Sequence, residues 1–461
     1  MGSGPNGEMT RVVIIGGGAA GLSAAYTLKK RDLDPILLEA GDRVGGRLDG
    51  DDVDGFRLDT GADFFCSSYD IAFRLCEELG LNVLRSRMQL GFFFENRWTH
   101  TMPVDSLSSA IKSLPWLWKL GFLSPRGALP AVKLATEIRR RSQFLNFSSD
   151  SRLAELDGDE NAASFLVRLG VPDGMLVLFR GLLEMTMGEL EQMSAPYGLT
   201  YLSEMLLKAG ALYVPQEGAS SLAYALRDAC GDSIRVSTPA RAVVVRDGAV
   251  VGVATDDGLI EADAVICAVP GTQVTRIVPD LPNGIRQALD KVVYSCGCRV
   301  VIGLDRPPLP SGWHGAVYPQ DETPLLLDRS INLPACVPPG KSTLDMMVGR
   351  DRAEALLPLD DEEIRRAMLD DARRVPPPGS ALPADNEGLF TRVYRWKEAV
   401  CMGPPGMFGA VADMRCEFER AGMKNLFLAG DYMRVPSVNG ALASGIDAAN
   451  EVASLFGRRS E

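Results

Sequence analysis

The chain has 461 residues, of which 46% are hydrophobic and 23% are charged. A chain of this length and apolar content can form a large buried core, which excludes disorder as its main state. Its 48 Lys and Arg against 60 Asp and Glu give a net charge of −12, which argues against nucleic acid as a partner.

The cysteines and histidines offer little to a metal site or to a His-based catalytic triad. There are nine cysteines and two histidines, and no spacing of them matches a zinc site. The cysteine count is odd and no export signal precedes the first predicted strand, so we expect a cytoplasmic protein without a bound metal. No apolar run reaches the ~18 residues that span a bilayer.

The first predicted strand, residues 11–15, ends in a glycine-rich turn. The turn reads GGGAAG from Gly16 to Gly21, and apolar residues then recur at helical spacing. Gly16 permits the tight turn, Gly18 leaves room for a pyrophosphate, and Gly21 lets the helix pack closely on the strand. We expect phosphates at the helix N-terminus, where free N–H groups and the helix dipole favour anions.

The second predicted strand, residues 35–38, leads into Glu39, which lies 18 residues after Gly21. A carboxylate at this place can accept hydrogen bonds from both ribose hydroxyls and would repel a 2′-phosphate. Strand, turn, helix and acid together predict that an adenine dinucleotide binds here.

Two further segments indicate which dinucleotide binds. The sequence RVGGR at 43–47 follows the second strand, and DTGADF at 59–64 adds another glycine turn. The series GxGxxG, Glu and RxGGR resembles the FAD-dependent amine oxidase superfamily. That group includes monoamine and polyamine oxidases, protoporphyrinogen oxidases and phytoene-type desaturases. The resemblance implies FAD as the cofactor.

The resemblance also implies roles for residues of both segments. Arg43 and Arg47 would contact the phosphates and ribityl region of FAD, and Gly61 and Ala62 would line the flavin ring. Asp63 would then lie beside the ring, either in a structural turn or as a group that orients a substrate.

Residues 86–205 are expected to be mainly helical. Within the stretch 104–146, seven Lys and Arg stand against two acids, and tryptophans lie among them. Two interpretations stay open: a basic surface that touches a membrane or admits an anionic apolar substrate, and a solvated helical face over a core. Pro115, Pro125 and Pro130 are expected to break any long amphipathic helix there.

A β-rich segment at residues 235–270 resembles the middle part of the family's FAD domain. By that resemblance the backbone from Ala240 to Val243 would lie against the adenine. Residues 291–394 are predicted to mix strands and helices, with a strand at 300–304 in a substrate-binding sheet.

The substrate side departs from the amine oxidase pattern. Arg299 stands where amine oxidases carry a Lys that holds a water near flavin N5, and Arg cannot act as a tunable base. The paired tyrosines that cage an amine nitrogen fall at Met402 and Ser437, and neither is aromatic. Cys401 lies near a position at which some members attach FAD, the alternative being a buried inert thiol. Trp396 either walls the flavin or substrate, or packs in the core.

The last predicted strand, residues 425–429, ends in Gly430 and Asp431, and a helix of small residues opens near Ser437. This is similar to the family's last motif, whose Gly–acid pair reaches the ribityl and pyrophosphate. The helix N-terminus there would point at the flavin N1–C2=O edge, where a positive helix end stabilises the anionic reduced ring.

We therefore predict a two-domain α/β flavoprotein. A discontinuous Rossmann-like FAD-binding domain comprises residues 10–85, 206–290 and 395–461, and a mixed α+β substrate-binding domain comprises residues 86–205 and 291–394. The candidate catalytic residues are Arg299, Trp396 and Asp63. The predicted cofactor-binding residues are Gly16, Gly18, Ala19, Ala20, Gly21, Glu39, Ala40, Arg43, Gly46, Arg47, Gly61, Ala62, Asp63, Ala240, Val243, Gly430, Asp431, Val438 and Ala441.

The predicted activity is FAD-dependent oxidation or desaturation of a largely apolar small molecule by hydride transfer to flavin N5. A porphyrinogen oxidase or desaturase type of reaction, or another biosynthetic oxidation, fits this description, with oxygen or another acceptor taking the electrons. Amine oxidation is one alternative, and a redox-neutral isomerase or cyclase is another. A non-catalytic FAD-binding protein would leave the flavin-edge motifs without a purpose.

Overall fold

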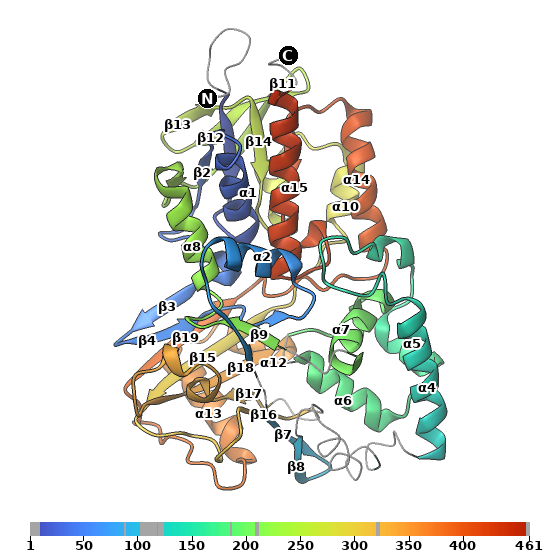
Figure 1. Cartoon of the computed structure of the whole chain (residues 1–461), viewed down its shortest axis with the longest axis vertical. Coiled ribbons are helices and arrows are strands. Elements are labelled where there is room, and N and C mark those ends of the chain that lie inside the picture. The colour runs from blue at the N-terminus through green and yellow to red at the C-terminus, as the bar shows by residue number, and fades with distance from the viewer. Residues whose placement is uncertain are drawn as a thin grey trace.

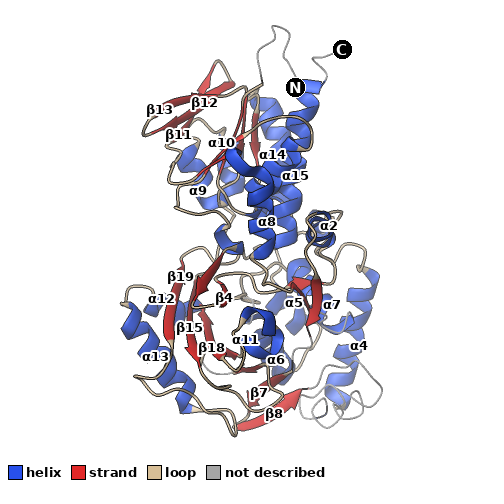
Figure 2. Cartoon of the chain, turned by 60° about the vertical axis from the view of Figure 1, so that its left-hand side comes forward, coloured by secondary structure: helices blue, strands red, loops and turns tan. Residues whose placement is uncertain are grey.

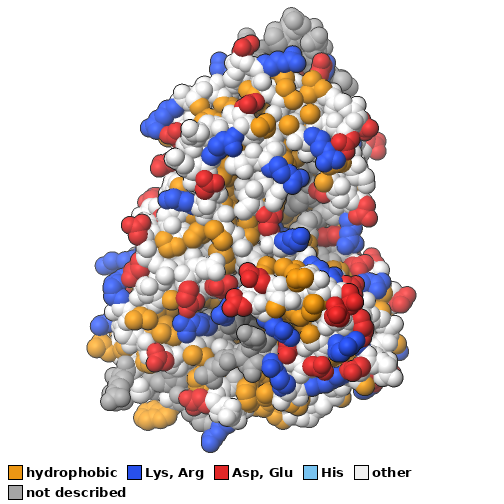
Figure 3. Space-filling view, turned by 180° about the vertical axis from the view of Figure 1, so that it is seen from behind, with side chains coloured by type: hydrophobic (Ala, Val, Ile, Leu, Met, Phe, Trp, Pro, Cys, Tyr) orange, Lys and Arg blue, Asp and Glu red, His pale blue; other side chains and the backbone are white. Residues whose placement is uncertain are grey.

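The computed structural model describes residues 10–86, 89–101, 118, 124–184, 187–207, 212–319 and 323–457. The molecule has an upper part, which holds both ends of the described chain, and a lower part built around a large curved sheet (Figure 1). On the face seen in Figure 3, Lys and Arg side chains are intermingled with Asp and Glu over both parts.

A five-stranded parallel sheet forms the core of the upper part. Its order is β10 (Ile234–Arg235), β2 (Ile36–Leu38), β1 (Val12–Ile15), β14 (Ala264–Cys267) and β20 (Leu426–Leu428). All residues of β1 and β14 are buried, as expected for strands covered on both faces. The strands come from the beginning, middle and end of the chain.

Two helices from opposite ends of the chain pack side by side on this sheet: α1 (Ala19–Lys29) and α15 (Val438–Gly457) (Figure 1). The contact is close because Gly445 has no side chain; a Cβ there would lie 2.0 Å from the Ala20 carbonyl oxygen. Ser23 Oγ also donates to the Leu442 carbonyl at 2.9 Å. The remaining helices of this part are α2 (Asp70–Glu78), α8 (Ser221–Cys230), α9 (Gly271–Ile277), α10 (Asn283–Leu289) and α14 (Met407–Ala421).

The β-rich segment predicted at 235–270 is confirmed. It forms an antiparallel sheet of β11 (Ala242–Arg246), β12 (Ala249–Thr255) and β13 (Gly258–Glu261) and then enters the parallel sheet as β14.

The lower part is built on a seven-stranded sheet. In order, its strands are β19 (Phe390–Trp396), β15 (Gly297–Leu304), β18 (Ser342–Gly349), β17 (Leu325–Leu327), β16 (Gly315–Val317), β7 (Leu90–Phe94) and β8 (Arg97–Thr101). The strand predicted at 300–304 lies within β15. Figure 2 shows α12 (Arg350–Leu356) and α13 (Asp361–Arg374) on one side of this sheet.

The expectation that 86–205 is mainly helical is wrong at its beginning, where β7 and β8 form a hairpin. Its two-residue turn, Glu95 and Asn96, has positive φ at both positions (48° and 58°), as the tight hairpin turn requires. The aromatic residues on either side favour strand, and this pattern could have been recognised from the sequence. From residue 124 to 207 the described segment is helical, with α4 (Pro125–Arg140), α5 (Ala162–Arg168), α6 (Asp173–Glu184) and α7 (Ala195–Leu207).

The expected proline break is wrong at Pro130 of α4. Pro125 lies in its first turn, which Ser124 caps by accepting a hydrogen bond from the Gly127 N–H at 3.0 Å. The helix then continues through Pro130, because the buried Leu134 and Ile138 anchor it to the core. Pro115 lies outside the described residues.

Short sheets and a one-turn helix join the two parts. They are the hairpin of β3 (Gly50–Val53) and β4 (Phe56–Asp59), the sheet of β5 (Phe65–Cys66), β9 (Leu212–Pro215) and β6 (Val83–Ser86), and α11 (Arg329–Asn332). Among the described residues no helix is long and apolar enough to cross a bilayer.

Candidate active site

The glycine turn after β1 has the geometry that the sequence predicts. Gly16 has a φ of +103°, and a Cβ at Gly21 would lie 1.9 Å from the Gly16 carbonyl oxygen, so the turn and the helix–strand contact both require glycine. At Gly18, the N-cap of α1, a Cβ would meet no atom within 4 Å. The space beside Gly18 at the helix N-terminus is therefore open, which fits a pyrophosphate.

Glu39 is held rigidly at the end of β2. Its Oε2 accepts a hydrogen bond from the Gly17 N–H and its Oε1 one from the Gly41 N–H, both at 2.7 Å. Each carboxylate oxygen keeps room for another donor, so the side chain can still accept from a ribose.

The predicted adenine segment lies next to Glu39. The Thr238 N–H donates to the Glu39 carbonyl at 2.8 Å, which brings Ala240 and the start of β11 to the same turn. The Val243 side chain is buried, so any contact it makes with an adenine would come from its backbone.

The RVGGR segment lies against the glycine turn, but its first arginine points away from it. A Cβ on Gly46 would lie 3.4 Å from the Gly18 Cα. Arg43 pairs with Asp49 (Nε to Oδ2, 2.7 Å) and its side chain is half exposed. The phosphate contact implied for Arg43 stays a prediction.

The two terminal motifs meet in an ion pair. Arg47 donates to both carboxylate oxygens of Asp431, at 2.7 and 3.0 Å, although the two residues are 384 positions apart. Tyr294 adds a hydrogen bond from its hydroxyl to Asp431 at 2.9 Å, and its ring lies 4.9 Å from the Arg47 guanidinium carbon. Gly430 is fixed to α15, because its N–H donates to Ser444 Oγ at 2.9 Å.

A segment that we call the clamped segment, residues 59–63, lies between the upper and lower parts. Its Thr60 carbonyl accepts from Trp396 Nε1 at 3.0 Å and its Gly61 carbonyl from Arg299 Nη1 at 3.3 Å. The Ala62 N–H donates to the Arg47 carbonyl at 2.9 Å. The clamped segment is therefore fixed from both parts of the molecule.

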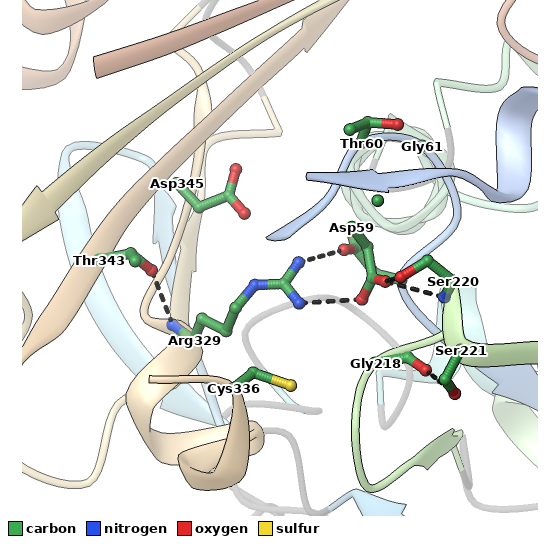
Figure 4. A network of polar contacts seen from close by, with 12 residues as sticks. Asp59, Thr60, Gly61, Gly218, Ser220, Ser221, Arg329, Cys336, Thr343 and Asp345 are labelled. Carbon is green, nitrogen blue, oxygen red and sulfur yellow. Dashed lines mark hydrogen bonds and ion pairs between the residues drawn. The ribbon is translucent and has the colours of Figure 1, made fainter. Parts of the chain in front are cut away.

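The acids of the clamped segment belong to a buried charge network. Asp59 pairs with Arg329 (Oδ2 to Nη1, 2.9 Å) and accepts from the N–H and hydroxyl of Ser220 at 2.9 and 2.7 Å (Figure 4). Asp63 Oδ1 accepts from Arg329 Nη2 and from Arg299 Nη2, both at 2.9 Å. The buried Asp59 and Arg329 thus tie the hairpin of β3 and β4 to α11.

Arg299 is the other centre of this network. Its Nε donates to Asp345 Oδ1 at 2.8 Å, and its Nη2 pairs with the second oxygen of the same carboxylate. The side chain is 1% exposed. The geometry therefore makes Arg299 a positioning residue of the network, with no open side toward a substrate.

A pocket opens beside this network. Its polar end contains Asp63, Asp345 and Arg329, with Asp328 nearby in the wall. The remaining lining is mainly apolar: Phe64, Ser86, Leu212, Val214, Leu325, Leu327, Leu333 and Met347.

The other singled-out residues lie around the clamped segment and α15. Trp396 is half-buried on β19 and bound to Thr60, so it supports the clamped segment. Met402 is fully buried, and Ser437 accepts from the Gly440 N–H at the start of α15 (2.9 Å). Cys401 is buried, and burial raises the pKa of its thiol, which favours an inert thiol over a reactive one.

Sequence reasoning missed three network residues: Ser220, Arg329 and Asp345. A single acid inside the apolar run of β18 and a single arginine inside that of β15 are a recognisable pattern, because a charge buried in a strand needs a partner. No comparable pattern marks Ser220. Among the described residues no cluster of His, Cys, Asp and Glu could hold a metal ion.

A dinucleotide fold with an open helix N-terminus, joined to a pocket beside a clamped backbone segment, is the architecture of an FAD-dependent oxidoreductase. The chain belongs to the family of flavin-containing amine oxidoreductases, whose model matches residues 19–453. FAD is its cofactor.

Known relatives cover nearly the whole chain. Coproporphyrinogen III oxidase of Mycobacterium tuberculosis is 26% identical and aligns with 93% of this chain and 94% of its own length. The chloroplastic/chromoplastic 15-cis-phytoene desaturase of Glycine max is 24% identical, over 94% of this chain and 78% of its own. The structure of a putrescine oxidase triple mutant has a TM-score of 0.73 and 19% identity, and covers 97% of this chain and 100% of its own.

Proposed function

We propose that the protein oxidises or desaturates a small, largely apolar organic molecule bound in the pocket beside the clamped segment. The observation that carries this proposal is the pocket itself, whose walls are mainly aliphatic and whose polar end is formed by Asp63, Arg329 and Asp345. Such a pocket binds an apolar body and fixes its orientation through a few polar groups.

The chain's own residues would bind and orient FAD. The open N-terminus of α1 at Gly18 would receive the pyrophosphate, and Glu39 the ribose. Gly61 and Ala62 would lie along the flavin ring, and the N-terminus of α15, at Val438 and Ala441, would face its N1–C2=O edge. Bound there, FAD supplies an acceptor for a hydride from a substrate C–H bond.

Within this class we favour a porphyrinogen oxidase or desaturase type of reaction. The relatives named for such reactions align with 93% and 94% of this chain, and the apolar walls suit a hydrocarbon framework. Amine oxidation is the second candidate, because the polar end of the pocket carries more acids than arginines and would attract a cation. Against it, the positions of the amine-caging tyrosines hold Met402 and Ser437.

Anaerobic mixing of the FAD-loaded protein with amines, porphyrinogens and unsaturated or terpenoid lipids tests the proposal. We expect bleaching of the oxidised-flavin absorption band by a member of the second or third group, and recovery of the band when air or another acceptor is admitted. Bleaching by amines alone would contradict the favoured reaction and support the second candidate. A product formed without consumption of an acceptor would indicate a redox-neutral isomerase or cyclase instead.

We also propose that α4 forms part of a membrane-contacting surface. Leu129 and Val132 of this helix are 60% and 63% exposed, beside the exposed Lys133 and Arg139. Exposed apolar side chains next to basic ones suit the surface of an anionic bilayer. Of the predicted basic stretch at 104–146, residues 104–117 and 119–123 lie outside the described residues.

We expect the double substitution Leu129→Ser/Val132→Ser to reduce the fraction of protein that sediments with vesicles containing anionic lipid. The serines remove the apolar area that would enter the lipid interface. Val167→Ser is the matched control, because Val167 is 60% exposed on α5. Equal sedimentation of the wild type and both variants would show that α4 does not contact the membrane.

A further inference from the structure

We propose that Asp63 is the proton acceptor of the oxidation, and that Arg299 and Arg329 hold its carboxylate at the polar end of the pocket. This inference rests on the proposed function. It deepens that function by assigning the hydrogen that FAD does not take.

The charges around Asp63 do not balance. Both oxygens of Asp345 are bound by Arg299, and Asp59 is paired with Arg329 and with Ser220. These are two matched pairs of one acid and one arginine. Asp63 is a third acid on the same two arginines, so the five side chains together carry one uncompensated negative charge.

Only part of the Asp63 carboxylate is used by this network. Oδ1 accepts from both arginines, at 2.9 Å each, and Oδ2 forms no hydrogen bond with a described residue. The Asp63 side chain is 16% exposed and lines the pocket, whereas those of Asp59 and Asp345 are 1% and 2% exposed. Asp63 is therefore the acid of the network that a pocket-bound molecule can reach.

The other acid of the pocket wall is occupied differently. Asp328 is fully buried, and its Oδ1 accepts from the Ser330 N–H, the Ser330 hydroxyl and the Ser342 hydroxyl at 2.6 to 2.9 Å. Its Oδ2 has no hydrogen-bond partner among the described residues, but Asp328 is 0% exposed and offers no surface to a pocket-bound molecule. Asp328 thus serves α11, and Asp63 stays available to the substrate.

The proposed reaction requires such a group. Oxidation to an unsaturated product removes two hydrogens and two electrons: one hydrogen leaves as hydride, which the enzyme's FAD accepts, and the other leaves as a proton. In our proposal the neighbouring N–H or C–H bond gives its proton to Asp63 Oδ2, its electron pair forms the new double bond, and the carboxylate becomes a carboxylic acid. A positioned base of this kind contributes about 10²- to 10⁴-fold to a rate.

The groups that face Asp63 set the direction in which its proton affinity moves. The pKa of Asp63 is raised, and burial is the largest cause. Arg299 of β15 and Arg329 of α11 lower this pKa. Asp345 of β18 and Asp59 of β4 raise it. A raised pKa suits an acceptor that must hold a proton during turnover. Because the charged form is the active base, the rate should increase as pH rises through this raised value.

The test compares Asp63→Asn with the wild type, both loaded with FAD. With the substrate that bleaches the flavin band of the wild type, we expect the FAD of Asp63→Asn to be reduced at least about 10²-fold more slowly. The reduction rate of this variant should also lack the wild-type increase with pH. The substitution keeps the shape and leaves two matched acid–arginine pairs, so FAD content should not change. Asp52→Asn, at an exposed position of β3, is the control and should behave as the wild type.

A second measurement does not depend on turnover. The infrared difference between the FAD-loaded wild type and Asp63→Asn, recorded over a pH series, should contain the C=O band of a protonated carboxyl group. We expect this band to disappear with rising pH at a midpoint above the ordinary Asp value of about 3.9. Asp345→Asn should move that midpoint downward, because it removes an acid that raises the pKa of Asp63.

The outcomes separate the two proposals. If no compound of the panel reduces the wild type, the proposed function fails, and the infrared titration alone decides the role of Asp63. A midpoint at or below the ordinary value would overturn our inference, as would reduction of Asp63→Asn at the wild-type rate and with the wild-type pH profile. If Asp63→Asn does not fold, the pH profile of Asp345→Asn tests the inference instead. A profile that is not shifted to lower pH from that of the wild type would overturn it.

Discussion

Gly21→Ala should abolish the folded protein, and Gly18→Ala should leave the fold intact but weaken FAD binding. The two glycines lie in one turn, three residues apart, and differ in what surrounds them. A Cβ at position 21 would lie 1.9 Å from a backbone oxygen that belongs to the same turn, which cannot move without separating α1 from β1. A Cβ at position 18 meets nothing, and the φ of −77° there is ordinary for alanine.

The same argument gives the size of each effect. Overpacking a close contact typically costs about 1–3 kcal/mol, and a backbone clash of this depth should exceed that range. At position 18 the methyl would occupy the space that we assign to the pyrophosphate. A cost of about 1–3 kcal/mol there corresponds to a rise in the Kd for FAD of roughly 5- to 150-fold.

Urea unfolding of the apoproteins and titration with FAD measure the two quantities separately. Gly18→Ala should have the unfolding free energy of the wild type and a higher Kd. If Gly18→Ala binds FAD with unchanged affinity, the pyrophosphate does not lie against Gly18. If Gly21→Ala folds and binds FAD normally, the close contact is not required.

The second large effect should come from Arg299→Met. This substitution removes the only arginine bound to Asp345 among the described residues, and leaves a carboxylate that is 2% exposed without its directly bound counter-charge. Breaking a buried ion pair on one side costs about 3–5 kcal/mol, a large part of an ordinary stability of about 5–15 kcal/mol. We expect the urea midpoint of the FAD-loaded protein to fall accordingly.

Two further variants show whether charge is the cause. Arg299→Met/Asp345→Leu removes both charges and should recover at least half of the lost free energy, since apolar replacement of a buried pair is often neutral or stabilising. Arg395→Met on the neighbouring strand β19 is the control; Arg395 pairs with the exposed Asp361, and such a pair contributes about 1 kcal/mol or less. A double variant as unstable as Arg299→Met would show that volume, not charge, dominates.

The sequence predicts the nucleotide-binding half far better than the pocket, for a physical reason. The turn at Gly16, Gly18 and Gly21 depends on local backbone conformation, so a short sequence carries its whole specification. The position of Glu39 at the end of the second strand follows from the length of one strand–helix–strand unit. The β-rich segment at 235–270 is predictable for the same reason, because glycine and aspartate mark its turns.

The pocket depends on pairings between distant segments. Asp63, Arg299 and Arg329 meet only because a loop, a sheet strand and a one-turn helix converge, and no periodicity in the sequence encodes that convergence. The charges of Arg299 and Asp345 within apolar strands indicate that each has a partner, but not which one. In the hairpin of β7 and β8 the aromatic residues favour strand, but the turn residues Glu95 and Asn96 are a weaker hairpin signal than Asn-Gly.

The pairing of Arg47 with Asp431 has a consequence for how the protein matures in the cell. The ribosome adds about 5–20 residues per second, so roughly 20 to 80 s separate the synthesis of these two partners, 384 positions apart. Until β20 is made near the end of that interval, β14 lacks this neighbour, and the nascent chain exposes an apolar strand edge that can pair wrongly. Because Asp431 and α15 are synthesised late, we expect the predicted FAD site to be complete only after most of the chain has been made.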